Sequence, residues 1–131
     1  MKTIHVSSHS GNDRWSGSRP TPDTDATDGP LRTLAAAQLA VRKLRRNAQE
    51  PEPIEVVLSG GGYLQERTLT FDAADSGTGV RGHFDGRTFP VTWRAANGEK
   101  VIVGGGRRID KWTTAQLNGR TVWCADVPWM D

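Results

Sequence analysis

The chain contains 131 residues, of which 35% are hydrophobic, and includes 15 glycines and 7 prolines. This length is typical of one domain, and the composition excludes a disordered chain and favours short strands and turns over a helical bundle. The net charge of +2 does not indicate a nucleic-acid-binding protein. The one basic cluster, Arg42 to Arg46, is explained by the negative carboxyl end of a predicted helix.

The amino terminus begins with a strand-like alternation, Met1–Val6, and lacks the apolar run of a signal peptide. No stretch approaches the ~20 apolar residues that cross a membrane. We expect a protein that is cytoplasmic as the chain stands, or secreted if a leader upstream of Met1 was removed, with no membrane partner. Cys124 is the single cysteine, which excludes an internal disulfide and a cysteine-based zinc site.

The first part of the chain is predicted to form one strand, a long loop and one helix. Residues Ile4–Ser8 alternate as a short strand does, whereas residues 16–30 are rich in small and polar residues and have no apolar periodicity. Apolar residues then recur every three or four positions, which predicts a helix over about 34–47 with Thr33 as its N-cap. Pro51 ends this pattern.

Short β-rich runs separated by glycine-rich corners follow the helix. Leu69 precedes Val91 by 22 positions and Ile102 precedes Trp123 by 21, which is close to the length of one coil of a β-solenoid. A β-sandwich also has short strands at regular intervals, so the periodicity leaves both folds open. The predicted strands are Ile54–Leu58, Thr68–Phe71, Val91–Arg94, Lys100–Val103 and Thr121–Ala125, and the corners are Gly60–Gly62, Gly77–Gly79 and Gly104–Gly106.

Ordered sequence blocks favour the solenoid, because they resemble the start of right-handed parallel β-helix proteins. Ile4–Ser8 with Gly11–Asp13 resembles their opening strand and turn, Asp28–Leu34 resembles the segment leading into their capping helix, and Val56–Tyr63 resembles their first coil. Val80–Phe89 departs from the pattern as an insertion. Further similar segments are Leu69, Phe71, Asp75–Thr78, Val91–Ala95, Gly98–Val101, Gly105–Ile109 and Trp112.

The resemblance is to the pectin lyase-like fold, and most of all to the β-helix glycoside hydrolases that include fucosidases and xylanases. It implies a mainly β chain that starts a right-handed parallel β-helix, as one domain. Residues 1–53 would form the strand, loop and capping helix, and residues 54–131 the first coils of a solenoid that is incomplete at its carboxyl end. A carbohydrate-binding module or a purely structural solenoid remain alternatives.

In related β-helix enzymes the catalytic residues lie on later coils, so the resemblance implies that this chain alone is inactive. Its parent would be a glycosidase, or alternatively a polysaccharide lyase, that acts on a polysaccharide or oligosaccharide. The sequence assigns no catalytic residue, no cofactor and no metal site. The glycines after the strand at 101–103 lack the third glycine of a dinucleotide-binding motif, because Ile109 stands there. His5 and His9 lie about 13 Å apart in an extended chain, too far for one ion, and His83 stands alone.

The carboxylates and tryptophans are the remaining candidates for carbohydrate chemistry. Trp93 and Trp123 fall within predicted strands and are expected in the core or between coils. Trp15 lies in a loop and is the residue that we expect to contact substrate. Glycosidases use paired carboxylates, but the candidates here lie in turns, where aspartate accepts local backbone hydrogen bonds. They are Asp13, Asp28, Asp75 and Asp85.

Overall fold

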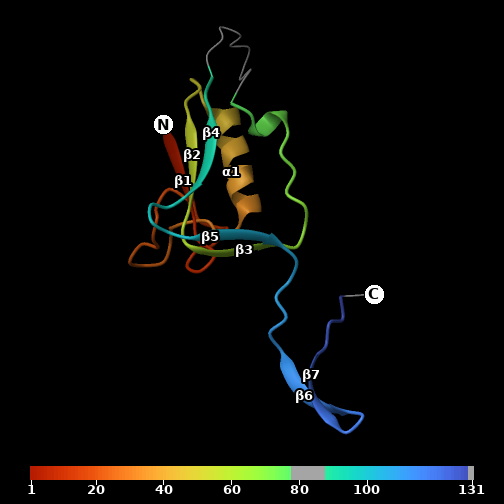
Figure 1. Cartoon of the computed structure of the whole chain (residues 1–131). Coiled ribbons are helices and arrows are strands. Elements are labelled where there is room, and N and C mark those ends of the chain that lie inside the picture. The colour runs from red at the N-terminus through yellow and green to blue at the C-terminus, as the bar shows by residue number, and fades with distance from the viewer. Residues whose placement is uncertain (78–87, 130–131) are drawn as a thin grey trace.

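The computed structural model describes residues 1–77 and 88–129, and most of the predicted insertion Val80–Phe89 lies outside these residues (Figure 1). The described chain is mainly β with one α-helix, as the sequence predicts. Its elements are β1 (Lys2–Val6), α1 (Leu34–Asn47), β2 (Ile54–Leu58), β3 (Gly61–Gln65), a 3-10 turn (Ala73–Asp75), β4 (Val91–Ala95), β5 (Val101–Gly105), β6 (Trp112–Leu117) and β7 (Arg120–Ala125).

Two parallel ladders are formed by successive passes of the chain. In the first, β1, β2 and β4 pair in that order, so that Ile4, Val56 and Trp93 lie side by side. In the second, β3 pairs with β5. A short corner leads from β2 into β3 and another from β4 into β5, and Figure 1 shows the second ladder crossing the foot of the first and of α1.

The hydrophobic core lies between the first ladder and α1. Alternate residues of β1 and β2 point inward because side chains alternate between the two faces of a strand, and Val6 and Val56 are fully buried. Helix α1 buries the stripe that contains Ala37 and Val41 against them. Tyr63 extends this core to β3, and its hydroxyl lies 2.8 Å from the carbonyl oxygen of Ser59.

The outer edge of β1 is covered by the long loop between β1 and α1. The backbone N–H of His5 donates to the carbonyl oxygen of Gly17 at 2.7 Å, and the N–H of Leu31 donates to that of His5 at 2.9 Å. Ser7 donates in turn to Leu31 at 2.8 Å. The edge of the first ladder is therefore satisfied on this side, as buried or paired backbone groups must be.

Strands β6 and β7 form an antiparallel hairpin that extends away from the ladders (Figure 1). The two residues at its tip, Asn118 and Gly119, have positive φ angles of 48° and 74°. An Asn-Gly pair with these angles is typical of the tight turns that join hairpin strands. Only the second strand of this hairpin is predicted from its β-rich composition, although the Asn-Gly pair is the signal that identifies both strands.

Two predictions about the strands are wrong and a third is right in part. Thr68–Phe71 is irregular chain. The corner predicted at Gly60–Gly62 is present at Gly60, but β3 already begins at Gly61, which has the expected positive φ, 134°. The intervals of 21 and 22 residues do not mark coils: the paired residues Ile54 and Val91 are 37 positions apart, and Gly61 and Val101 are 40 apart. The reason is that strand register is set by pairing between distant segments, which local spacing does not encode.

Within the described residues, no helix has the length and apolar character needed to cross a membrane.

Candidate functional site

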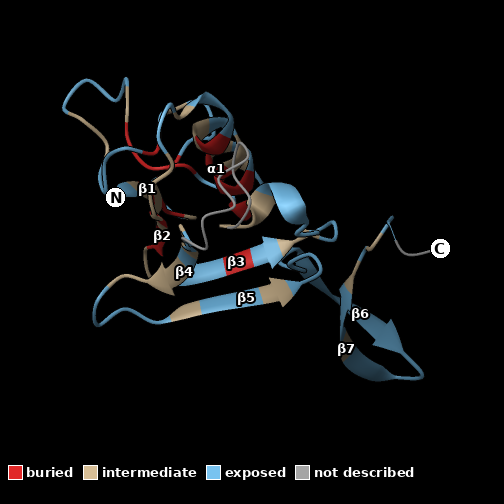
Figure 2. Cartoon of the chain, turned by 90° about the horizontal axis from the view of Figure 1, so that it is seen from above, coloured by how far each residue is buried: buried red, intermediate tan, exposed pale blue. Residues whose placement is uncertain are grey.

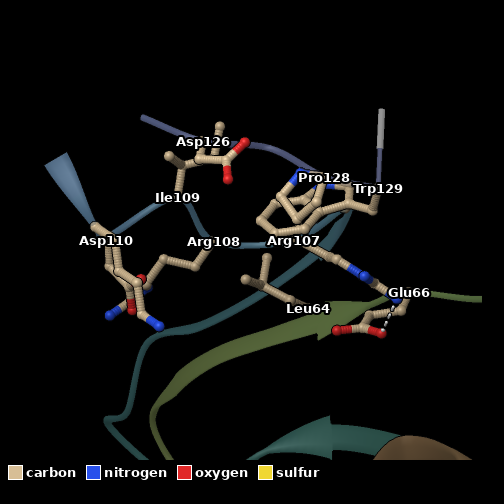
Figure 3. A pocket seen from close by; sticks show the side chains of 11 residues that line it. Leu64, Glu66, Arg107, Arg108, Ile109, Asp110, Asp126, Pro128 and Trp129 are labelled. Carbon is tan, nitrogen blue, oxygen red and sulfur yellow. Dashed lines mark ion pairs between the residues drawn. The ribbon is translucent and has the colours of Figure 1, made fainter. Parts of the chain in front are cut away.

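A cavity of about 630 Å³ lies between the end of β3, the segment after β5 and the segment after β7 (Figure 3). Its volume is within the range of small-molecule sites. Three basic, three acidic and several apolar side chains share its wall, so it is both polar and partly aromatic. The lining residues are Leu64, Glu66, Gly106, Arg107, Arg108, Ile109, Asp110, Lys111, Asp126, Pro128 and Trp129.

The ring of Trp129 is the aromatic surface of this cavity. The guanidinium carbon of Arg107 lies 5.4 Å from the centre of the ring, and the Arg107 Nη2 atom lies 2.9 Å from a carboxylate oxygen of Glu66. Both charged groups are about half exposed, so the ion pair adds at most about 1 kcal/mol to stability. The ion pair links the end of β3 to the segment after β5, and the contact of Arg107 with the Trp129 ring links that segment to the carboxyl-terminal one.

The carboxylates of the cavity are Glu66, Asp110 and Asp126, and all three residues are exposed. A glycosidase acid needs a raised pKa, which enzymes obtain by burying the carboxyl group in apolar surroundings. The cavity therefore has groups that can bind a hydroxylated ligand, but no carboxyl group that is desolvated for proton transfer. The sequence does not predict this site, because its parts come from three separate segments.

A second cavity, of about 670 Å³, runs along β3 on the side of α1. It shares Leu64 and Glu66 with the first cavity. Leu39 of α1 is 65% exposed and lines it together with Tyr63. The two cavities thus lie on either side of the end of β3.

Trp15, predicted to contact substrate, lies among the loop residues that cover β1. A methyl group placed on Gly29 would come within 2.8 Å of the Trp15 ring, so the ring packs directly on the backbone there. The residue is half-buried and lines neither of the two cavities. The ring therefore has a packing role in the loop, and its contact with substrate stays a prediction.

The predicted carboxylates hold turns together. Asp13 accepts the backbone N–H groups of Arg32 at 2.7 Å and Thr33 at 2.9 Å, next to the start of α1. Asp28 accepts the N–H and the hydroxyl of Ser16, and these hydrogen bonds lower the pKa of its carboxyl group. Asp85 lies outside the described residues.

Asp75 fastens the 3-10 turn to α1. Its carboxylate accepts two hydrogen bonds from Arg42, at 2.7 and 2.9 Å, and one from Gln38 at 3.0 Å. The Arg42 guanidinium is the main reason that the pKa of Asp75 falls to about 2. Arg42 and Arg45 of the basic cluster are thus both in use, since Arg45 donates to the carbonyl oxygens of Glu52 and Phe89.

The histidines do not form a metal site in the described chain. No group of three or more metal-ligating side chains exists among residues 1–77 and 88–129. His5 lies on the outer face of the first ladder, where burial and the nearby Arg94 lower its pKa. Arg94 itself is paired with Glu55 at 2.7 Å. His83 lies outside the described residues.

The two tryptophans predicted to be buried, Trp93 and Trp123, differ in how far they are exposed. Trp93 is half-buried against the core, with its ring centre 5.5 Å from that of Phe71 in an edge-to-face contact. Trp123 was predicted to lie in the core or between coils, but it lies on the hairpin and is 71% exposed. Within the described residues, β7 pairs only with β6, so no coil covers Trp123.

No protein-family model matches the chain, and no curated protein matches it. A solved structure named "Glycoside hydrolase" is similar over 98% of this chain, with 30% sequence identity and a TM-score of 0.71. The chain spans 18% of that protein's length. The likeness supports a glycoside hydrolase-like fold and is consistent, at a coarse level, with a carbohydrate-active protein.

Proposed function

We propose that this chain forms the amino-terminal cap and first coils of a right-handed parallel β-helix in a carbohydrate-active protein. It is one domain, with the cap in residues 1–53 and the coils from residue 54 onward. The parent protein is a glycoside hydrolase that acts on a polysaccharide or oligosaccharide. Its catalytic residues lie on later coils, and this chain provides the scaffold on which those coils stack.

The observation that carries the proposal is the pairing of successive passes of the chain. The pass from β2 into β3 lies in parallel register on the pass from β4 into β5. Stacked, in-register parallel strands are how solenoid repeats bury a continuous core. Connections between parallel strands of one sheet are right-handed in nearly all proteins, which supports the handedness.

The two ends of the stack also fit the start of a solenoid. The loop and α1 cover the side of β1, whereas no strand within residues 1–77 and 88–129 pairs with the outer edge of β4. The N–H of Ile54 donates to Pro90 and that of Ala96 donates to Leu58, so the intervening N–H groups of Trp93 and Ala95 point away from β2. A further parallel strand would accept them.

Carbohydrate as the substrate class is supported by the similar structure named glycoside hydrolase, of which this chain spans 18%. The exposed carboxylates of the cavity support a role without proton transfer. Both points support the proposal that catalysis takes place in another part of the parent.

Amide hydrogen exchange tests the scaffold proposal. In the 131-residue chain, we expect the amides of Trp93 and Ala95 to exchange rapidly while those of Val56 and Leu58 are protected. In a chain extended by the residues that follow it in its gene, the amides of Trp93 and Ala95 become protected. A 131-residue chain that melts sharply and reversibly as a monomer, with Trp93 and Ala95 already protected, would contradict the proposal.

A non-catalytic carbohydrate-binding module is the second candidate, and the exposed ring of Trp129 in the cavity favours it. Calorimetric titration with plant and algal oligosaccharides tests whether this cavity binds sugar. If the cavity is the binding site, Trp129→Ala abolishes binding. Trp15→Ala reports on the loop tryptophan in the same experiment, and binding that survives both substitutions excludes both residues as the site.

A further inference from the structure

The β6–β7 hairpin has two chemically different faces. Directly paired residues of an antiparallel ladder project on the same side. One face therefore combines aromatic side chains with hydroxyl and amide groups, and the other has no aromatic side chain and combines three aliphatic residues with a threonine, an arginine and a cysteine. The first consists of Trp112, Thr114, Gln116, Thr121, Trp123 and Ala125, and the second of Thr113, Ala115, Leu117, Arg120, Val122 and Cys124.

The two tryptophans on the first face are strongly exposed. Trp123 is 71% exposed and Trp112 is 51% exposed. Trp123 lies opposite Thr114, two positions along β6 from Trp112, so the two tryptophans are diagonal neighbours about 7–8 Å apart in the backbone. Contiguous exposed apolar surface is typical of interaction sites, and these two neighbouring rings provide it on one face of the hairpin.

The polar groups between and beyond the rings are fixed in place. The Gln116 side-chain nitrogen donates to the Thr121 hydroxyl at 2.9 Å, and the Trp112 indole nitrogen donates to the carbonyl oxygen of Ile109 at 3.0 Å. The first bond orients an amide and a hydroxyl beside the strands, and the second fixes the indole ring of Trp112. Both hydrogen bonds restrict the side chains that would meet a ligand, which reduces the entropy cost of binding.

No residue of this face carries a charge. Nucleic-acid strands also stack on aromatic rings, but their sites combine the rings with a positively charged groove. An anionic polysaccharide would likewise need cations. A neutral sugar fits better, because its apolar C–H faces stack on indole rings while its hydroxyl groups bond with threonine and glutamine side chains.

We propose that the face formed by Trp112, Thr114, Gln116, Thr121 and Trp123 is a binding platform for a neutral oligosaccharide. This inference rests on the carbohydrate part of the proposed function, and it is separate from the loop residue Trp15 and from the cavity at Trp129. The platform lies on the hairpin that projects from the ladders (Figure 2), where a long chain of sugars has access to it.

The test is a titration of the isotope-labelled chain, and of any longer protein encoded by its gene, with xylohexaose and cellohexaose. The indole N–H signals of the five tryptophans are followed by NMR. We expect the signals of Trp112 and Trp123 to shift with a common dissociation constant while that of Trp15 does not move. Polygalacturonate and single-stranded DNA, used as anionic probes, should leave both signals unchanged.

Substitutions on the two faces provide the matched control. Trp123→Ala should weaken binding by about tenfold or more, Trp123→Phe should retain most of it because a flat ring remains, and Val122→Ala on the other face should leave it unchanged. The inference is overturned if neither neutral hexasaccharide shifts these signals, if only an anionic probe does, or if Val122→Ala weakens binding as much as Trp123→Ala. Amide exchange in β4 does not depend on whether the hairpin binds sugar. The platform proposal can therefore fail in the titration while the scaffold proposal still passes the exchange test, and the reverse can also be seen.

Discussion

The part of the chain up to Tyr63 and the described part beyond it differ in how they are stabilised. Every buried residue among the described ones lies at or before Tyr63, whereas seven of the large apolar residues after position 100 are strongly exposed (Figure 2). Both parts contain well-formed strands. The difference is one of degree in the ladders, because Val91 and Trp93 of β4 and Val101 of β5 pack against the edge of the core without being fully buried.

The polar groups of the two parts also differ in how far they are paired within the protein. In the first part, loop carbonyls and aspartate side chains satisfy the edge of β1 and the start of α1. In the second, the Arg107–Glu66 ion pair lies in solvent and the apolar surface of the hairpin is open. The backbone edge of the first part is therefore covered by its own loop, whereas the second part exposes more apolar and charged surface.

The largest expected difference in the free energy of unfolding comes from introducing a carboxylate into each of the two parts of the chain. Val56 is fully buried, so Val56→Asp should cost more than about 4 kcal/mol and unfold most of the protein, because an unpaired carboxylate is costly in an apolar core. Val103 is 56% exposed, and Val103→Asp should cost less than about 1 kcal/mol. Urea unfolding of the 131-residue chain measures both. Equal losses would show that the comparison between the two parts is wrong.

Glycine substitutions give the next largest difference. A methyl group at Gly11 would lie 2.2 Å from the carbonyl oxygen of Leu31 and 2.4 Å from that of Ser7, and neither backbone atom can move freely. Gly11→Ala should therefore cost about 3 kcal/mol. Nothing lies within 4 Å of such a group at Gly105, so Gly105→Ala should change stability by less than about 0.5 kcal/mol. Thermal melts compare them, and a Gly11→Ala variant as stable as the parent would contradict the packing of this turn.

The smallest expected effect is the pH dependence from Asp75, whose side chain is only 6% exposed. Its pKa is lowered from 3.8 to about 2, so the folded state favours the ionised carboxylate. This stabilises the fold by about 2 kcal/mol above about pH 4, and the contribution is lost as the pH falls toward 2. The free energy of unfolding, measured at several pH values, should therefore fall between about pH 4 and pH 2. Asp75→Asn should remove this slope, whereas Asp110→Asn in the exposed part should keep it. An unchanged slope in Asp75→Asn would exclude the Arg42 ion pair as its source.

Local patterns in the sequence predicted the elements whose signals are themselves local. Helix α1 has the predicted bounds and the predicted N-cap at Thr33, because its apolar periodicity and its capping hydroxyl lie within one stretch. Strand β2 also has its predicted bounds. The Asn118-Gly119 turn carried an equally local signal for the hairpin, and overlooking it led to the wrong expectation that Trp123 is covered.

The errors arose where apolar residues serve contacts between distant segments. Thr68–Phe71 has the composition of a strand, but Leu69 packs on the core, the Thr70 carbonyl accepts Gln38 at 2.7 Å, and Phe71 meets Trp93. A segment with the composition of a strand can therefore be irregular when its residues pack against α1. The cavity at Trp129 escaped prediction for a related reason, since β3 and two later segments meet there only after folding.

The sequence by itself determined the helix with its cap, the strand β2, the turn-forming role of the aspartates and a mainly β chain, since each depends on residues close together along the chain. Only the tertiary structure decided which strands pair, at separations of 37 and 40 positions, and which tryptophans are exposed. Register and burial depend on the balance between closing long loops and burying apolar surface, and that balance is a property of the whole folded chain.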